Sequence, residues 1–142
     1  PDHQHVARAL HSIATIHGSR GDHSRAVDLL RRSVEIQEHA LGLEHGDLIV
    51  PLIDLGLSLI ETGDLARART HLERAVNICE KEPGRAGNAG EARFALARAL
   101  WPEKPQRARV RQITEQAIAD MDGAGPRFAA DAAEARRWLK DR

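Results

Sequence analysis

The residues that could support catalysis begin with two carboxylates, Asp54 and Glu61, which lie seven positions apart and so share one face of a helix. Paired carboxylates can act as general acid and base, but such chemistry also needs a partner base, a metal or a phosphate-binding loop set in a pocket. The sequence shows none of these beside the pair. We therefore predict that the chain is not an enzyme and that it has no catalytic residue.

Histidines are the next candidates, because they could bind a metal, and all eight lie between His3 and His71. A metal site needs several ligands that converge on one point. His3 and His5 are two positions apart and cannot share a helix face, whereas His39 and His45 lie on either side of a predicted link. We interpret the histidines as solvated or capping side chains and expect no metal site and no cofactor.

The remaining chemical groups favour no other class of function. Cys79 is the only cysteine, which excludes an internal disulfide, and we interpret it as a small buried side chain. Residues 107–111 carry arginine at alternate positions, but they have acidic neighbours and no interleaved aromatic side chains for base stacking. The formal net charge is zero, no apolar run approaches the roughly 18 residues of a membrane span, and no signal peptide is visible. We therefore expect a cytoplasmic protein that binds neither nucleic acid nor membrane.

The element that must position these residues is the apolar stretch 47–62. In it, leucine recurs at helical spacing, at Leu48, Leu52, Leu55 and Leu59. Other apolar residues occupy the remaining sides, and a helix that is apolar all round must be sandwiched between neighbours. Gly56 lies at its middle, where the missing side chain allows another helix to approach. The stretch therefore predicts the central helix of a helical stack.

The chain contains an internal repeat of 42 residues, because residues 3–40 align with residues 45–82. The identical pairs fall at predicted core and turn positions: His3/His45, Leu10/Leu52, Gly21/Gly63, Asp22/Asp64, Arg25/Arg67, Ala26/Ala68, Leu30/Leu72, Arg32/Arg74, Val34/Val76, Ile36/Ile78 and Glu38/Glu80. Since these are the positions that helices and turns need, the repeat predicts consecutive structural units of the same kind.

Each unit is predicted to be two helices joined by a tight turn. Glycine can adopt the left-handed conformation that ends a helix and aspartate can cap the next one, so Gly21-Asp22 and Gly63-Asp64 mark the turns. In a degenerate third unit, residues 101–105 replace this turn. The predicted helices span residues 3–18, 22–41, 47–62, 64–82, 88–101, 105–122 and 127–141.

Helical periodicity also predicts which side chains face inward. In the first helix these are Val6, Leu10, Ile13, Ala14 and His17. The last helix is expected to be an end cap whose polar side faces solvent, formed by Asp131, Glu134, Arg136, Arg137 and Lys140. The repeat units are about 1–42, 43–84 and 85–123, followed by the capping helix 124–142. The chain begins partway through a unit and without Met, so we interpret it as a piece of a longer protein.

Small and apolar residues in both units resemble the tetratricopeptide repeat (TPR) signature, namely Ala14, Gly21, Ala26, Leu30 and Ser33, and Gly56, Gly63, Ala68, Leu72 and Ala75. The usual TPR unit has about 34 residues. The longer period here, together with histidine-containing links, resembles the kinesin-light-chain type of TPR. The sequence departs from the signature in its first helices, where Leu10 and Leu52 replace a tryptophan.

The C-terminal part, from Ala92 through Trp101-Pro102 to residues 137–139, resembles the closing segment of bacterial proteins that join an N-terminal serine/threonine kinase domain to a C-terminal TPR array. The kinase itself is not in this chain, since neither His-Arg-Asp nor Asp-Phe-Gly occurs. This resemblance implies a TPR region within a larger bacterial signalling protein.

The TPR resemblance implies a right-handed α-solenoid, all-α, of three antiparallel helix pairs plus a C-terminal capping helix, in which the first helix of each pair lines a concave face. The predicted partner-binding groove on that face consists of Arg8, His11, Thr15, Ile53, Asp54, Leu57, Glu61, Phe94, Arg98 and Trp101. The apolar members would form a strip, unless neighbouring repeats or the terminal helix cover them.

Some TPR arrays clamp a terminal carboxylate with lysine and asparagine on these helices. Here the corresponding places hold His11, Thr15 and Asp54, so that mode of binding is not expected. The expected function is a protein-interaction module that binds a protein or peptide segment. The alternative is a structural spacer or a self-association domain that forms homo-oligomers.

Overall fold

The computed structural model describes residues 2–142. In this part of the chain there are seven α-helices and three short 3-10 turns, and there is no strand. The helices are α1 (Asp2–Ser19), α2 (His23–Leu41), α3 (Ile49–Glu61), α4 (Leu65–Lys81), α5 (Ala86–Leu100), α6 (Arg107–Ala124) and α7 (Ala129–Lys140). The 3-10 turns are η1 (Gly46–Leu48), η2 (Lys104–Gln106) and η3 (Pro126–Phe128). The predicted all-α fold is confirmed, and each helix end lies within two residues of its predicted position.

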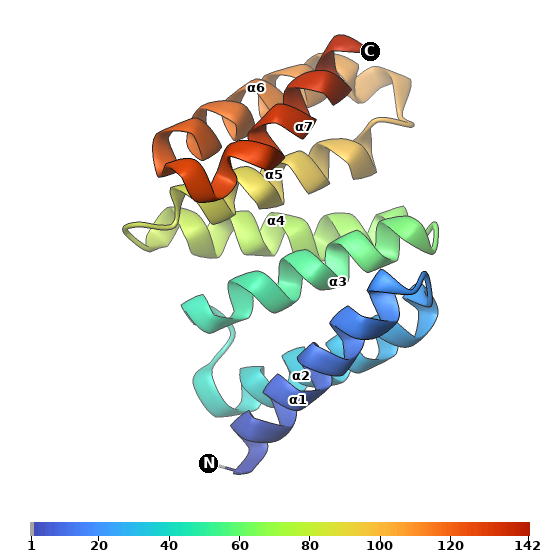
Figure 1. The fold of residues 1–142 in the computed structure, drawn as a ribbon, viewed down its shortest axis with the longest axis vertical. Coiled ribbons are helices and arrows are strands. Elements are labelled where there is room, and N and C mark those ends of the chain that lie inside the picture. Colours follow the sequence, from blue (N-terminus) through green and yellow to red (C-terminus); the bar gives the residue numbers. More distant parts are fainter. Residues whose placement is uncertain (1) are drawn as a thin grey trace.

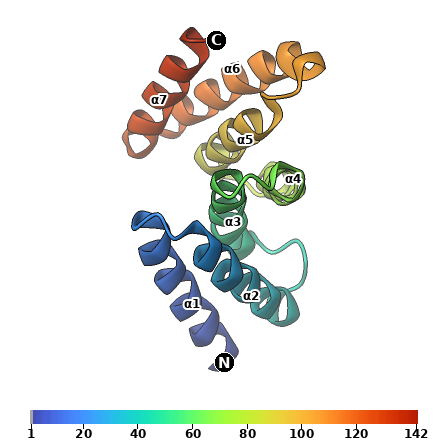
Figure 2. The same ribbon diagram turned by 90° about the vertical axis from the view of Figure 1, so that its right-hand side faces the viewer.

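Consecutive helices pack against one another and stack along the long axis of the molecule (Figure 1). The chain forms the hairpins α1/α2, α3/α4 and α5/α6, and α7 then folds back beside α6. Seen from the side, the stack curves, with α1 and α7 projecting on the same side and α3 between them, whereas α2 and α4 lie on the other side (Figure 2). This arrangement is the predicted α-solenoid.

The two Gly-Asp turns have nearly the same geometry. Gly21 and Gly63 adopt φ angles of 81° and 84°, the left-handed conformation that ends a helix at low cost only for glycine. Asp22 and Asp64 then cap α2 and α4, because each Oδ1 accepts a hydrogen bond from the backbone N–H three residues on, at 3.4 and 3.2 Å. The predicted turn is confirmed in both units.

The centre of the core is α3, as its composition predicts. Leu48, Leu52 and Leu55, just before and within this helix, are at most 1% exposed because α2 packs on one side and α4 on the other. At Gly56 a methyl group would lie only 2.5 Å from the side chain of Leu72 in α4. The missing side chain therefore sets the close approach of the two helices.

The first helix is less buried than predicted. Val6 and Ile13 were expected to face the core, but they are 44% and 45% exposed. Their counterparts 42 positions later, Leu48 and Leu55, are covered by α2, whereas within residues 2–142 no helix packs on that side of α1. The other three predicted inward residues of α1 are half-buried or buried. The prediction that Val6 and Ile13 are buried was wrong because it assumed a neighbouring helix on that side of α1.

The C-terminal helix α7 closes the other end of the stack with aromatic contacts. Trp138 meets Phe94 and Trp101 edge-on, with ring centroids 5.7 and 5.6 Å apart. Phe128 in η3 lies against Gly87, where a side chain would overlap its ring. These contacts hold α7 along α5 and α6, on the concave side of the stack.

Candidate functional site: a groove on the concave face

Two hollows on the concave face form one groove. The α3–α7 hollow lies between α3, α5 and α7 and has a volume of about 220 Å³, and the α1–α3 hollow lies between α1 and α3 and has about 420 Å³. Asp54, Leu57 and Arg98 line both hollows, so the two hollows adjoin along α3. We call the two together the concave groove.

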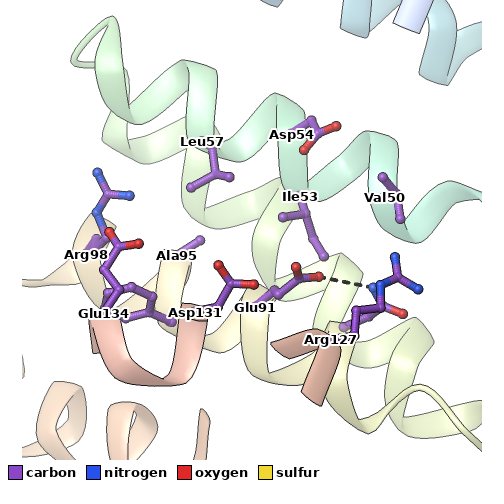
Figure 3. A pocket seen from close by; sticks show the side chains of 12 residues that line it. Val50, Ile53, Asp54, Leu57, Glu91, Ala95, Arg98, Arg127, Asp131 and Glu134 are labelled. Carbon is purple, nitrogen blue, oxygen red and sulfur yellow. Dashed lines mark hydrogen bonds between the residues drawn. The ribbon is translucent and has the colours of Figure 1, made fainter. Parts of the chain in front are cut away.

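The floor of the α3–α7 hollow is apolar. Ile53 and Leu57 of α3 face Ala95 of α5 (Figure 3), and Phe94 of α5 lines the same hollow. Ile53 and Phe94 are only 5% and 8% exposed. Leu57 is half-buried and keeps part of its side chain open to the groove. The structure thus brings three members of the predicted apolar strip together.

The fourth member of that strip, Trp101, lies elsewhere. Its half-buried ring packs against Trp138 of α7 and lies outside both hollows, next to Arg107 and Arg142. Here the terminal helix covers the side chain, which is the alternative that the sequence left open. Trp101 therefore contributes to the groove indirectly, because its contact with Trp138 holds α7 in place.

Two polar pairs cross the groove between successive helices. The imidazole Nε2 of His11 in α1 lies 2.6 Å from Oδ2 of Asp54 in α3. The guanidinium of Arg98 in α5 donates to Glu61 in α3 at 3.2 Å. Sequence reasoning placed all four residues on the concave face, and the structure joins them in pairs that link α1 to α3 and α3 to α5.

The other two predicted groove residues lie on α1. Thr15 lines the α1–α3 hollow, and its hydroxyl donates to the backbone carbonyl of His11 at 3.0 Å. Arg8 is exposed and lines neither hollow. The N-terminal part of α1 therefore extends beyond the groove.

Acidic residues that sequence analysis did not assign to the groove line its C-terminal wall. Asp131 and Glu134 were expected on the outer side of a capping helix, but they line the α3–α7 hollow opposite α3 (Figure 3). The reason is that α7 folds back onto the concave side, so its polar side borders the groove. Glu91 of α5 and Arg127 of η3 complete this wall. Treating α7 as the first helix of a fourth unit would have identified the wall.

The fold alters the ionisation of Glu91 in this wall. Burial raises the pKa of its carboxyl group, and the nearby carboxylates of Asp131 and Asp54 raise this pKa further. The Asn88 side chain, which donates to Glu91 at 3.1 Å, and the Arg127 guanidinium act in the opposite direction. The wall thus holds a partly desolvated carboxyl group under repulsion from its neighbours.

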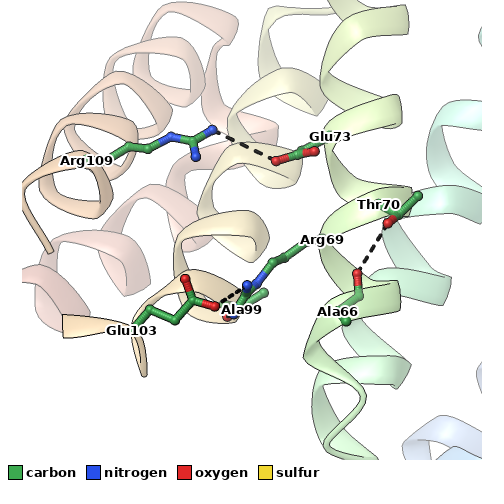
Figure 4. A network of polar contacts seen from close by, with 7 residues as sticks. All are labelled: Ala66, Arg69, Thr70, Glu73, Ala99, Glu103 and Arg109. Carbon is green, nitrogen blue, oxygen red and sulfur yellow. Dashed lines mark hydrogen bonds and ion pairs between the residues drawn. The ribbon is translucent and has the colours of Figure 1, made fainter. Parts of the chain in front are cut away.

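A second polar network lies away from the groove and joins helices. Arg69 of α4 donates from Nε and Nη2 to the carbonyl oxygen of Ala99, at 3.3 and 3.2 Å, and pairs with Glu103 (Figure 4). Carbonyl groups in the last turn of a helix have no partner inside the helix, so Arg69 caps α5. Arg109 of α6 reaches Glu73 of α4 at 3.9 Å. We assign these arginines a structural role.

The structure gives little support to a reactive thiol, a metal site or a membrane span. Burial raises the pKa of the Cys79 thiol to about 11, which keeps it protonated and a poor nucleophile. Over residues 2–142, no group of three His, Cys, Asp or Glu side chains is arranged to hold a metal ion. In the same stretch, every helix is too short or too polar to span a bilayer.

Comparison with known proteins gives a family match. The tetratricopeptide repeat family matches residues 6–47 and 52–84, which is more than half of the chain. The clustered mitochondria protein homolog of Coccidioides immitis is 26% identical over 76 residues, which make up 54% of this chain but only 6% of that protein.

The fold also has a close structural counterpart. A crystal structure from Podosopora anserina, of nearly identical TPR-like repeats of the kinesin-light-chain kind, superimposes with a TM-score of 0.76 at 23% identity. The match covers 98% of this chain and 65% of that one. At this identity the likeness concerns the fold. The family match and the structural likeness together confirm the predicted array of TPR units.

Proposed function

Because this chain belongs to the tetratricopeptide repeat family, whose repeats in general mediate protein–protein interactions and are non-catalytic, we propose that it binds a segment of a partner protein in the concave groove. The observation that carries this proposal is that two adjoining hollows on the concave face share Asp54, Leu57 and Arg98. A groove that runs past α1, α3, α5 and α7 suits an extended segment.

The composition of the groove supports the same function. It offers accessible apolar surface through Val50 and Leu57, and its rim supplies charged groups. Apolar surface contributes most of the affinity at such sites, while a few polar groups fix the orientation of the ligand. The groove therefore has both properties that the recognition of a peptide requires, and it needs no catalytic group.

A finer proposal concerns the protein to which the chain belongs. The resemblance of its C-terminal part supports a single TPR domain of three units and a cap within a larger, cytoplasmic bacterial signalling protein such as a serine/threonine kinase. Reading the gene upstream of the codon for Pro1 tests this directly. A kinase domain in the same reading frame is the expected result, and a frame without one contradicts the proposal.

One observation favours the alternative function, a self-association domain. Apolar side chains on α1 are exposed, with Val6 at 44%, Ile13 at 45% and Ile16 at 50%. Such a patch can bury itself against a second copy of the chain. Light scattering over a range of concentrations separates the two functions: a monomer supports the groove proposal, whereas a dimer that is dissolved by Ile13→Glu supports self-association.

Selection of peptides tests the groove proposal. A phage library of random 12-residue peptides is panned against the purified chain, and enriched peptides are then synthesised and titrated by fluorescence anisotropy. We expect Val50→Asn and Leu57→Asn, which place an uncharged polar group in the apolar floor, to weaken binding at least about tenfold. Thr70→Asn, on the exposed side of α4, is the matched control and should bind normally.

One measurement and the choice of Val50 make the result decisive. Thermal unfolding of each variant shows whether the fold is intact, and this matters for Leu57, which also packs against the core. Val50 is 40% exposed and can be changed with little effect on the core. The proposal is overturned if no peptide is enriched, or if both groove variants fold and bind as tightly as the Thr70→Asn control.

A further inference from the structure

We propose that the partner segment bound in the α3–α7 hollow carries an arginine or lysine side chain next to an apolar one, so that the groove selects basic segments. This inference rests on the function proposed above and specifies the chemistry of the partner. It follows from the charges of the hollow, the partners that those charges already have, and the apolar floor beside them.

Carboxylates outnumber cations around this hollow. Four acidic side chains line it, while its only lining cations among the described residues are Arg98 and Arg127. The acidic groups come from three helices, with Asp54 on α3, Glu91 on α5, and Asp131 and Glu134 on α7. The chain as a whole has a formal net charge of zero, so the negative charge is local to the groove.

The internal ion pairs leave the negative charge of the wall largely unbalanced. Arg98 is engaged by Glu61 at 3.2 Å, which lies outside the α3–α7 hollow, so this cation does little for the opposite wall. Arg127 is exposed and lies over the Phe128 ring at 5.3 Å. Within the described part of the chain, Asp131 and Glu134 form no ion pair and no side-chain hydrogen bond. They are therefore available to a ligand.

Glu91 adds a reason why a cation is favoured. It is half-buried, and the carboxylates of Asp131 and Asp54 act on it together with burial to raise its pKa. A guanidinium or ammonium group from a partner would relieve this repulsion and pair with a carboxylate that water solvates poorly. An acidic partner residue would increase the repulsion and would be rejected.

The apolar floor explains why a basic side chain suits the hollow better than a metal ion does. Arginine and lysine can lay their methylene groups along Ile53 and Leu57 while the charged head reaches the carboxylates at the rim. A metal ion would need several ligands at one point, and the part of the chain that the structure describes has no such group of three side chains. The spread of the carboxylates around the rim fits a long, flexible cation.

The peptides selected from the random library test this inference. We expect them to be enriched in arginine and lysine and depleted in aspartate and glutamate, relative to the unselected library. In one enriched peptide that contains arginine, replacing this arginine by citrulline, which has nearly the same shape but no charge, should weaken binding about tenfold or more.

The protein side of the test uses a double-mutant cycle. Asp131→Asn combined with Glu134→Gln should weaken the basic peptide about tenfold and leave the citrulline peptide nearly unchanged. The matched control is Glu35→Gln combined with Glu115→Gln, which removes the same charge from exposed positions on α2 and α6 and should change neither affinity. A long-range effect of net charge would appear equally in both double variants.

The outcomes separate this inference from the function on which it rests. If peptides bind the groove, as shown by loss of binding in Val50→Asn, but acidic or uncharged peptides are selected, the basic partner is wrong and the interaction module stands. Equal losses in the two double variants also overturn the inference. If no peptide binds at all, the proposed function fails first.

Discussion

The hairpins α1/α2 and α3/α4 are two copies of the same 42-residue repeat and fold in the same way, yet the equivalent side chains of their first helices are buried to different extents. Val6 and Ile13 of α1 are about half exposed, whereas their counterparts Leu48 and Leu55 are 0% and 1% exposed. The difference comes from α2, which covers α3 on the side where α1 has no neighbour among the described residues. In a solenoid, the adjacent unit determines how deeply a repeat residue is buried.

The C-terminal end of the stack shows the opposite solution. There α7 covers the last hairpin, and Trp138 packs against both Phe94 and Trp101. One end therefore leaves apolar repeat positions open, and the other covers them with aromatic residues that lie outside the 42-residue pattern. Equivalent substitutions along the chain should consequently have unequal effects, which gives direct tests of this comparison.

The largest expected difference concerns the paired positions 13 and 55. Leu55→Ala should lower the free energy of unfolding by about 2–5 kcal/mol, because it leaves a cavity in a fully buried site. Ile13→Ala should cost about 1 kcal/mol, since Ile13 is already 45% exposed. Urea unfolding followed by circular dichroism measures both. Equal losses would show that a neighbour, such as a second copy of the chain, covers α1 in solution.

The next effect concerns two helical glycines. Gly56→Ala should destabilise the chain by about 1–2 kcal/mol, because a methyl group 2.5 Å from Leu72 forces the two helices apart and outweighs the better helix propensity of alanine. Gly18→Ala should stabilise it by about 0.5 kcal/mol, since its nearest neighbour outside the helix, the Ala26 Cβ, would be 4.0 Å away. If thermal unfolding showed that both substitutions stabilise the chain, or that both destabilise it, the close approach of α3 and α4 would be contradicted.

Much of the fold was predictable because its determinants are local. Gly21 and Asp22 specify a turn through their own conformational preferences, and the same pair recurs 42 residues later. The apolar composition of α3 likewise indicates a helix covered on two sides. The exposure of Ile13 was not predictable in this way, because it depends on which helix packs against α1.

The groove was predictable in part for the same reason. Ile53, Asp54 and Leu57 lie on a helix whose orientation follows from the repeat, and sequence analysis placed them on the concave face. Asp131 and Glu134 were assigned to the outer side, because their position depends on the return of α7 after Gly125 and on the packing of Trp138. These are contacts between distant parts of the chain, so the helical periodicity of α7 alone does not reveal them; only its place as the first helix of a fourth unit would.

A smaller effect tests the similarity of the two turns. Asp22→Ala and Asp64→Ala each remove a carboxylate that caps the following helix, at 3.4 and 3.2 Å from a backbone nitrogen. Each change should therefore cost about 1 kcal/mol. Nearly equal losses in urea unfolding are expected. A loss of less than half as much for one of them would show that the two turns differ in solution despite their common geometry.

The smallest effect depends on pH and distinguishes the second helices of the two hairpins. His71 of α4 stands where α2 has Leu29, which cannot ionise. Burial lowers the pKa of His71, and the nearby Arg74 lowers it further. Below about pH 6.5, the reference pKa of histidine, the unfolded chain therefore binds a proton that the folded chain excludes, so stability should fall as the pH decreases. His71→Leu places leucine at this repeat position in both hairpins. It should remove the loss of stability that His71 causes between pH 7.5 and 5.5. Parallel stability curves for the variant and the parent protein would show that His71 is as open to solvent in the folded chain as in the unfolded one.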